Sequence, residues 1–289
     1  MKRGAKIFRT LPVAVLMTTL TGLCFAMIPP SVAADDSPAS VSAVAPQQEA
    51  PLEITADMTL EWHRNDRRYI ARGDVVARQG DLSIRTDLLT ADYRETAQSN
   101  TDIYRLTADG NVHIESSGNH ATGSHAVYDV DDARAVLTGD NLALFSDTQR
   151  ITARDRIEYH TLDGRLEAIG GVVLTKAQDK IEADRMSAVF EHDATGKRVL
   201  KTMTATGNVV ITTPDEILTG RRGTYVAATN IATLEGGVTI RRGPHLLEGE
   251  KAEVNLETNV SRMTGDLATG HRVRGVFYPD SNGGTPALR

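Results

Sequence analysis

Apolar and polar residues alternate with period two over most of the chain, in short segments separated by glycine. Val75 with Ala77 and Val112 with Ile114 are examples. Because successive side chains of a strand point to opposite faces, each segment turns an apolar edge inward and a polar edge toward water. No stretch combines the i, i+3, i+4, i+7 apolar spacing of a helix with capping residues. The pattern therefore predicts strands throughout, about 20 of them at the usual strand length.

A short signature marks the segment boundaries: glycine, then Asp, Asn or Gly, then an aliphatic residue. Glycine alone accepts positive φ freely, so such pairs are typical of positions where a strand begins or bends. Successive copies lie 37, 29, 31, 37, 29 and 29 residues apart. The copies are Gly73-Asp74-Val75, Gly110-Asn111-Val112, a degenerate Gly139-Asp140-Asn141-Leu142, Gly170-Gly171-Val172, Gly207-Asn208-Val209, Gly236-Gly237-Val238 and Gly265-Asp266-Leu267.

The chain also repeats itself on a longer scale. Shifting it by 97 residues aligns 54–139 with 151–236 without a gap, and 27 of the 86 aligned pairs are identical, which chance does not produce. We therefore expect one domain over 52–278, built from tandem halves at about 54–150 and 151–266. Many short strands with regular turns indicate either two facing sheets or a stacked parallel coil. The uneven intervals favour two facing, mainly antiparallel sheets over a parallel β-helix.

The N-terminal segment predicts export. A basic head with Lys2, Arg3, Lys6 and Arg9 precedes a short apolar run, and small residues follow at the expected cleavage positions, so 1–33 reads as a signal peptide. Its removal takes away the single cysteine, Cys24, and moves the formal charge from −6 to −10. A negative chain argues against nucleic-acid binding. Low-complexity composition predicts a flexible leader at 34–51, and a Gly- and Pro-containing segment predicts a disordered tail at 279–289.

Several motifs, in order, resemble the OstA-like family of lipopolysaccharide-transport proteins. They cover 52–174 well and reach the second half through the internal repeat. Each motif is short, and their order and spacing together carry the resemblance. They are Ile54-Thr55-Ala56-Asp57, Gly73-Asp74-Val75-Val76, Gln79-Gly80, Ile84-Arg85-Thr86-Asp87, the set Gly123, Ala126, Tyr128 and Asp129, and Val136-Leu137-Thr138-Gly139.

The resemblance implies a fold and a function. The implied fold is a twisted, V-shaped β-jelly roll, and the implied activity is transport of lipopolysaccharide across the periplasm without catalysis or a cofactor. The implied partners are a like-folded protein anchored in the inner membrane and the amino-terminal domain of an outer-membrane barrel, with head-to-tail homo-oligomers as a further possibility. A cleaved signal peptide selects the soluble periplasmic bridge among the relatives. The chain is longer than expected of a compact bridge protein.

The acyl chains of lipid A would bind between the two sheets. Aromatic residues make up only 4% of the chain, so the inward Val, Ile, Leu and Ala side chains leave room for a slot, although a closed core is the competing interpretation. Residues two and four positions after each glycine share one face, and others join them. The candidate lipid-binding residues are Leu52, Ile54, Val75, Leu82, Ile84, Leu89, Tyr93, Val112, Ile114, Val172, Leu174, Ile181, Met186, Phe190, Val209, Ile211, Val238 and Ile240.

Other polar features suggest less. The basic pairs Arg67-Arg68, Arg221-Arg222 and Arg241-Arg242 could contact phosphate or simply lie in solvated turns. The spacing of His113, His120 and His125 fits no closed zinc site, so we expect no metal. No catalytic motif is present. A β-solenoid enzyme acting on polysaccharide and a structural surface repeat remain as alternative functions. The strands around 52–60 and 253–263 are the candidate open edges for pairing with another chain.

Overall fold

The structure is a computed structural model of the chain, and it describes residues 51–96, 101–194, 198–258, 260–266, 270 and 272–278. The predicted signal peptide, the predicted tail and all of the predicted leader except Pro51 lie outside the described residues. Nearly everything described is strand, with one short 3-10 helix, η2 (Ala227–Thr229). No helix in the described part of the chain is long and apolar enough to span a membrane.

Eighteen strands join in one hydrogen-bonded sheet within the described residues. They are β1 (Glu53–Thr55), β2 (Thr59–His63), β3 (Arg68–Gln79), β4 (Leu82–Arg94), β5 (Asp102–Ser116), β6 (Asn119–Asp129), β7 (Arg134–Thr138), β8 (Ala143–Phe145), β9 (Gln149–Thr152), β10 (Arg156–His160), β11 (Arg165–Lys176), β12 (Asp179–His192), β13 (Arg198–Thr212), β14 (Ile217–Val226), β15 (Ile231–Arg242), β16 (His245–Asn255), β17 (Val260–Thr264) and β18 (Arg274–Val276).

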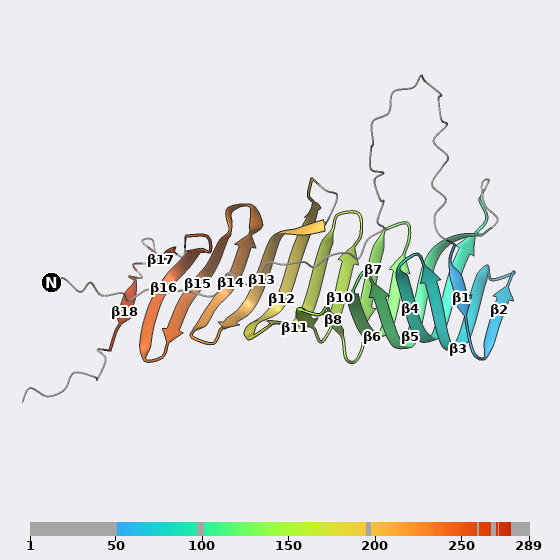
Figure 1. Cartoon of the computed structure of the whole chain (residues 1–289), viewed down its shortest axis with the longest axis horizontal. Coiled ribbons are helices and arrows are strands. Elements are labelled where there is room, and N and C mark those ends of the chain that lie inside the picture. The colour runs from blue at the N-terminus through green and yellow to red at the C-terminus, as the bar shows by residue number, and fades with distance from the viewer. Residues whose placement is uncertain are drawn as a thin grey trace, which may run out of the picture.

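The strands follow one another along the long axis in chain order, from β1 and β2 at one end to β17 and β18 at the other (Figure 1). Every pairing between neighbours is antiparallel. The predicted all-β class is therefore confirmed, and the parallel coil of a β-solenoid is excluded for the described strands.

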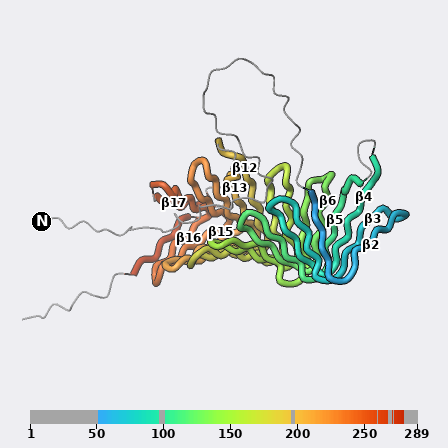
Figure 2. The backbone as a smooth tube through the Cα atoms, turned by 45° about the vertical axis from the view of Figure 1, so that its right-hand side comes forward, coloured from blue at the N-terminus to red at the C-terminus, as the bar shows by residue number. Residues whose placement is uncertain are grey.

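The sheet is folded into two facing layers by bends within its own strands. The ten long strands, β3–β6 and β11–β16, each shift register near the middle, as at Arg72/Val75 in β3 and Glu182/Arg185 in β12. The first layer holds the parts of the long strands that align with β2, β7, β10 and β17, and the second layer holds the parts that align with β1, β8, β9 and β18. The blue and green strands of Figure 2 show the resulting V-shaped trough. The two predicted sheets are thus the two arms of one sheet.

Five of the glycine signatures, those at Gly73, Gly110, Gly170, Gly207 and Gly236, form the corner where the layers meet. At Gly110 and Gly207 the backbone φ is +80° and +78°, and the following residues, Asn111 and Asn208, are also left-handed at +45° and +46°. A Cβ at Gly110 would collide with the carboxylate of Asp87 on the adjacent strand. That carboxylate accepts a 2.8 Å hydrogen bond from Asn111 Nδ2. The signature is therefore the device that turns each strand from one layer into the other.

The 97-residue repeat is visible in the hydrogen bonds of this corner. Asp184 stands 97 residues after Asp87, and it accepts a 2.9 Å bond from Asn208 Nδ2 just as Asp87 does from Asn111. The copies meet where β7 pairs with β10 and β8 pairs with β9. The predicted edge at 253–263 is right for 260–263, which lie in the terminal strand β17, and wrong for 253–255, which lie in β16 and pair on both sides. The terminal strands at that end are β17 and β18.

Candidate functional site

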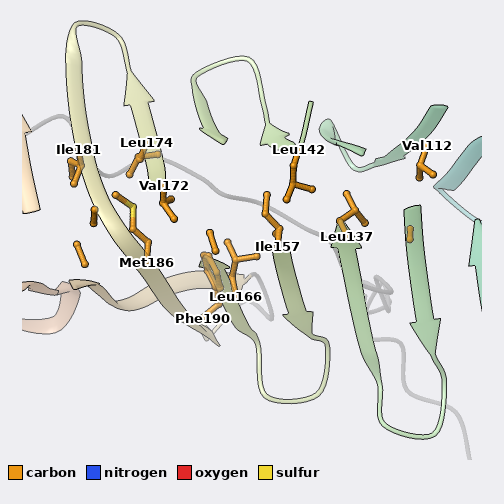
Figure 3. Packing of buried hydrophobic residues seen from close by; sticks show 14 of the residues in the cluster. Val112, Leu137, Leu142, Ile157, Leu166, Val172, Leu174, Ile181, Met186 and Phe190 are labelled. Atoms are coloured by element: carbon orange, nitrogen blue, oxygen red, sulfur yellow. The ribbon is translucent and has the colours of Figure 1, made fainter. Parts of the chain in front are cut away.

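The inner face of the V is a continuous apolar surface running the length of the molecule. The third residue of five corner signatures is a valine, and each of these valines is almost completely buried: Val75, Val112, Val172, Val209 and Val238 are 0–1% exposed. These valines and the residues around them form one large cluster of buried side chains, part of which Figure 3 shows between the strands of the two layers. The burial of this surface provides the main stabilisation of the fold.

Burial beyond the corner differs from strand to strand. Ile114, Ile211 and Ile240 lie two positions beyond the corner valines on the same face, and they are only half-buried while still packing on the cluster. Residues such as Leu89 and Ala71, close to the bend in the first layer, are 2% and 1% exposed. Leu174 and Ala77, at the equivalent positions of β11 and β3, are only 5% and 2% exposed. The inside of the V is therefore closed at the corner, and beyond it only some strands leave the inner face accessible.

The residues predicted from the sequence lie on this inner face. Sixteen of the eighteen belong to the large cluster or pack against it. Leu82 is half-buried outside the cluster, and Tyr93 is 4% exposed in an aromatic stack with Tyr69, whose ring centroid lies 5.2 Å away. Their role in binding lipid stays a prediction.

Sequence reasoning missed the part of this surface in the middle of the chain. Leu137, Leu142, Ile157 and Leu166 are 3–6% exposed and belong to the same cluster. Leu137 and Leu142 flank the degenerate signature at Gly139, where the strand is broken into β7 and β8 and the count from the glycine fails. The 97-residue repeat aligns Ile157 with Leu60 and Leu166 with Tyr69, and neither of these was a candidate, so the repeat did not single them out.

Two apolar cavities open between the layers. The first has a volume of about 80 Å³ and is lined by Leu137, Ile157, Leu166 and Phe190 of the first layer and by Ile114 and Leu144 of the second, with Arg198 at its edge. The second has a similar volume of about 80 Å³ and lies beside Ile181, Met203, Ile211 and Leu256, with Asp179 at its edge. Each cavity is therefore an apolar space with an ionisable side chain on its border.

A lysine and an aspartate flank the turn between β11 and β12. Lys176 is only 5% exposed, and its Nζ has no hydrogen-bond partner within the described structure. Burial lowers the pKa of Lys176, and burial raises the pKa of Asp179; the charge of each residue partly offsets the shift of the other. Both groups are therefore pushed toward their neutral forms at the edge of the apolar surface.

One arginine of each basic pair noted in the sequence lies close to an acidic side chain. Arg68 lies 2.9 Å from Asp92, Arg221 lies 3.4 Å from Glu250, and Arg242 lies 3.6 Å from Glu216. The turn interpretation is wrong for two pairs, because Arg221-Arg222 lie in β14 and Arg241-Arg242 in β15; contact with phosphate stays a prediction.

The three histidines do not come together. His125 Nδ1 lies 2.5 Å from a carboxylate oxygen of Asp109, and His120 stacks on Phe145. No group of His, Cys, Asp and Glu among the described residues could hold a metal ion.

The two ends of the repeat differ in exposure. At the junction of the two copies Ile157 of β10 pairs with Leu137 of β7, and both are 6% exposed. Its counterpart Leu60, on β2 at the free end, is 58% exposed, and the neighbouring Trp62 is 49% exposed. The same inward positions are thus covered inside the chain and uncovered at its end.

Two comparisons find similar proteins. A family model described as LptA/(LptD N-terminal domain) LPS transport protein matches the chain twice, over 53–165 and 150–260. A similar solved structure is LptH of Pseudomonas aeruginosa, described as the LptA homologous periplasmic component of the conserved lipopolysaccharide transport device. The identity is 18%, the TM-score is 0.38, and the match covers 45% of this chain and 95% of LptH. Among curated proteins, none matches the chain significantly.

Proposed function

The chain belongs to the family of lipopolysaccharide transport proteins formed by LptA and the N-terminal domain of LptD, and from this premise we propose that it carries lipopolysaccharide through the periplasm by holding the lipid A acyl chains between its two layers. The family is one of transport proteins rather than enzymes. The signal-peptide pattern at 1–33 supports the periplasm as its location.

The observation that carries the proposal is one apolar inner face that runs from end to end and is only partly closed. A closed core would bury Ile114, Ile211 and Ile240 as fully as the corner valines, whereas these three remain partly accessible. An acyl chain laid along them leaves water at about 0.8 kcal/mol per buried methylene, so even a short stretch of chain binds favourably.

The size of the cavities indicates how a lipid enters. Each is about 80 Å³, well below the roughly 150 Å³ of an engineered cavity that admits benzene. A whole acyl chain therefore has to part the arms of the V or lie along the rim. The strands join the arms only at the glycine corner, and beyond it the arms touch through side chains alone, so they can part without breaking the pairing between neighbouring strands.

We further propose that the free ends join like-folded partners as the two copies join each other. Inside the chain, β7 pairs with one edge of β10, while the equivalent edge of β2, beside the exposed Leu60 and Trp62, has no strand beyond it in the described structure. Unpaired edge strands invite pairing with another chain. The partners would be an inner-membrane-anchored protein, the N-terminal domain of an outer-membrane barrel, or a second copy of this chain.

The direct test is photo-crosslinking in living cells with a labelled lipopolysaccharide. A photoreactive residue replaces Ile211, which faces inward, and in a matched control it replaces the adjacent Val210, which faces outward on the same strand; Ile114 and His113 make the same comparison in the first copy. We expect capture from Ile211 and Ile114 and little from their neighbours. Equal capture from both faces, or capture from none of the four positions, would overturn the proposal.

A further inference from the structure

The first cavity contains a cation among apolar side chains. Leu137, Ile157, Leu166 and Phe190 all turn toward the interior in Figure 3, and these residues line the cavity together with Arg198, the first residue of β13. Arg198 is half-buried and lies opposite His192 at the rim of the first layer. The cavity thus joins an apolar interior to a guanidinium at its edge.

The guanidinium is fixed in place by uncharged groups. Its Nη2 donates to the carbonyl oxygen of Thr161 at 2.6 Å, its Nη1 donates to the hydroxyl of Tyr159, and its Nε lies 3.4 Å from Nε2 of His192. Within the described residues Arg198 forms no ion pair with a carboxylate, unlike Arg94, which is bound to Asp131 and Asp102. Arg198 therefore keeps an uncompensated charge and N–H groups available for a ligand.

The internal repeat shows that this site is a departure from the common pattern. In the first copy the equivalent space is filled by Trp62, Tyr69 and Tyr93: Trp62 stacks on Tyr69, and its Nε1 donates a 2.9 Å bond to the Tyr93 hydroxyl. In the second copy the aligned residues are Tyr159, Leu166 and Phe190, and Arg198 takes the position of Thr101. These side chains are smaller than their counterparts and leave the space open. Phe190 also lacks the hydroxyl group with which Tyr93 accepts a hydrogen bond from Trp62.

We propose that Arg198 and this cavity form a binding site for the anionic end of an amphiphile: a phosphate held by the guanidinium, with the attached alkyl chain in the apolar space. A planar guanidinium binds phosphate oxygens through paired N–H donors, and a partly buried cation in apolar surroundings is stabilised by an anion. The inference rests on the proposed function, because the phosphate of a lipid A headgroup is the natural source. The second copy would then fix the headgroup, and the first copy would contact acyl chains only.

The test measures binding of decyl phosphate, below its micelle concentration, to the full chain by titration calorimetry. Decanol and inorganic phosphate are the comparison ligands. We expect decyl phosphate to bind best, and Arg198→Gln to weaken it by about ten- to a hundredfold, the effect of losing a charge-assisted hydrogen bond, while decanol binding is unchanged. Arg241→Gln removes one charge from the exposed surface and should change nothing, and Tyr159→Phe should retain binding because the guanidinium remains.

Each outcome decides the question. Inorganic phosphate binding as tightly as decyl phosphate would show a free-phosphate site and overturn the amphiphile. Equal losses in Arg198→Gln and Arg241→Gln would show a general charge effect and overturn the site. Arg198→Lys keeps the positive charge. When its circular dichroism matches the wild type, a loss of decyl phosphate binding in this variant is not caused by a loss of folding. Lipopolysaccharide capture at Ile211 without an effect of Arg198 would leave the transport proposal standing and this inference refuted.

Discussion

The glycine corner makes a quantitative prediction, which the substitution Gly110→Ala tests. A side chain at a left-handed backbone position costs about 1–2 kcal/mol, and φ is +80° there. The new Cβ would also displace the Asp87 carboxylate that Asn111 binds at 2.8 Å, at about 1 kcal/mol for the lost hydrogen bond. We expect a total loss of about 2–3 kcal/mol in the free energy of unfolding.

A double-mutant cycle separates the two contributions. Asp87→Ala alone should cost about 1 kcal/mol, and the double substitution should cost no more than Gly110→Ala, because the hydrogen bond can be lost only once. The single effects should therefore exceed the double effect by about 1 kcal/mol. Strictly additive effects would show that Asp87 does not oppose a side chain at this position.

The assay is urea unfolding followed by the fluorescence of Trp62, the single tryptophan, which lies in the first copy. Gly207→Ala with Asp184→Ala provides the matched pair in the second copy, where φ at the glycine is +78° and the same clasp exists. If Gly110→Ala lowers stability by less than about 0.5 kcal/mol, within the range of ordinary surface substitutions, the corner glycines are not required by their backbone conformation and the reasoning fails.

Three further predictions follow from burial and exposure. Ile157→Ala should cost about 2–4 kcal/mol because the side chain is 6% exposed at the repeat junction, whereas Leu60→Ala at the equivalent free end should cost under about 0.5 kcal/mol; similar losses in urea unfolding would contradict the difference in covering. Burial raises the pKa of Glu216 above its ordinary 4.5, so the folded state binds the proton more tightly and stability falls as the pH rises from 4.5 through the folded pKa. Glu216→Gln should remove that fall, and thermal melts from pH 4 to 7 that keep the wild-type slope would speak against it. Leu60→Asp should weaken self-association or partner capture in sedimentation velocity with little change in the melting temperature, since Leu60 is 58% exposed; unchanged association would count against pairing at this end.

Local sequence determined much of the fold. The period-two alternation identified the inward faces correctly from Val75 to Ile240, because the alternation of side chains along a strand needs no information about neighbours. The Gly-Asp, Gly-Asn and Gly-Gly pairs marked the bends for the same reason, since left-handed backbone is a property of single residues. The repeat of 97 residues likewise required only the chain itself.

Tertiary structure decided what depends on register between distant strands. The glycine pairs could not reveal that each strand continues into the second layer, so the two predicted sheets are one folded sheet. Leu137 and Ile157 become neighbours only when β7 pairs with β10. Residues 253–255 are internal because β16 pairs with both β15 and β17, whereas 260–263 are terminal because β17 pairs with β16 alone in the described structure. The placement of Arg198 in an apolar cavity depends on three elements, the strands of Ile157 and Phe190 and the turn at Thr161. Alternation in the sequence says which way a side chain points, and only strand pairing says what it meets there.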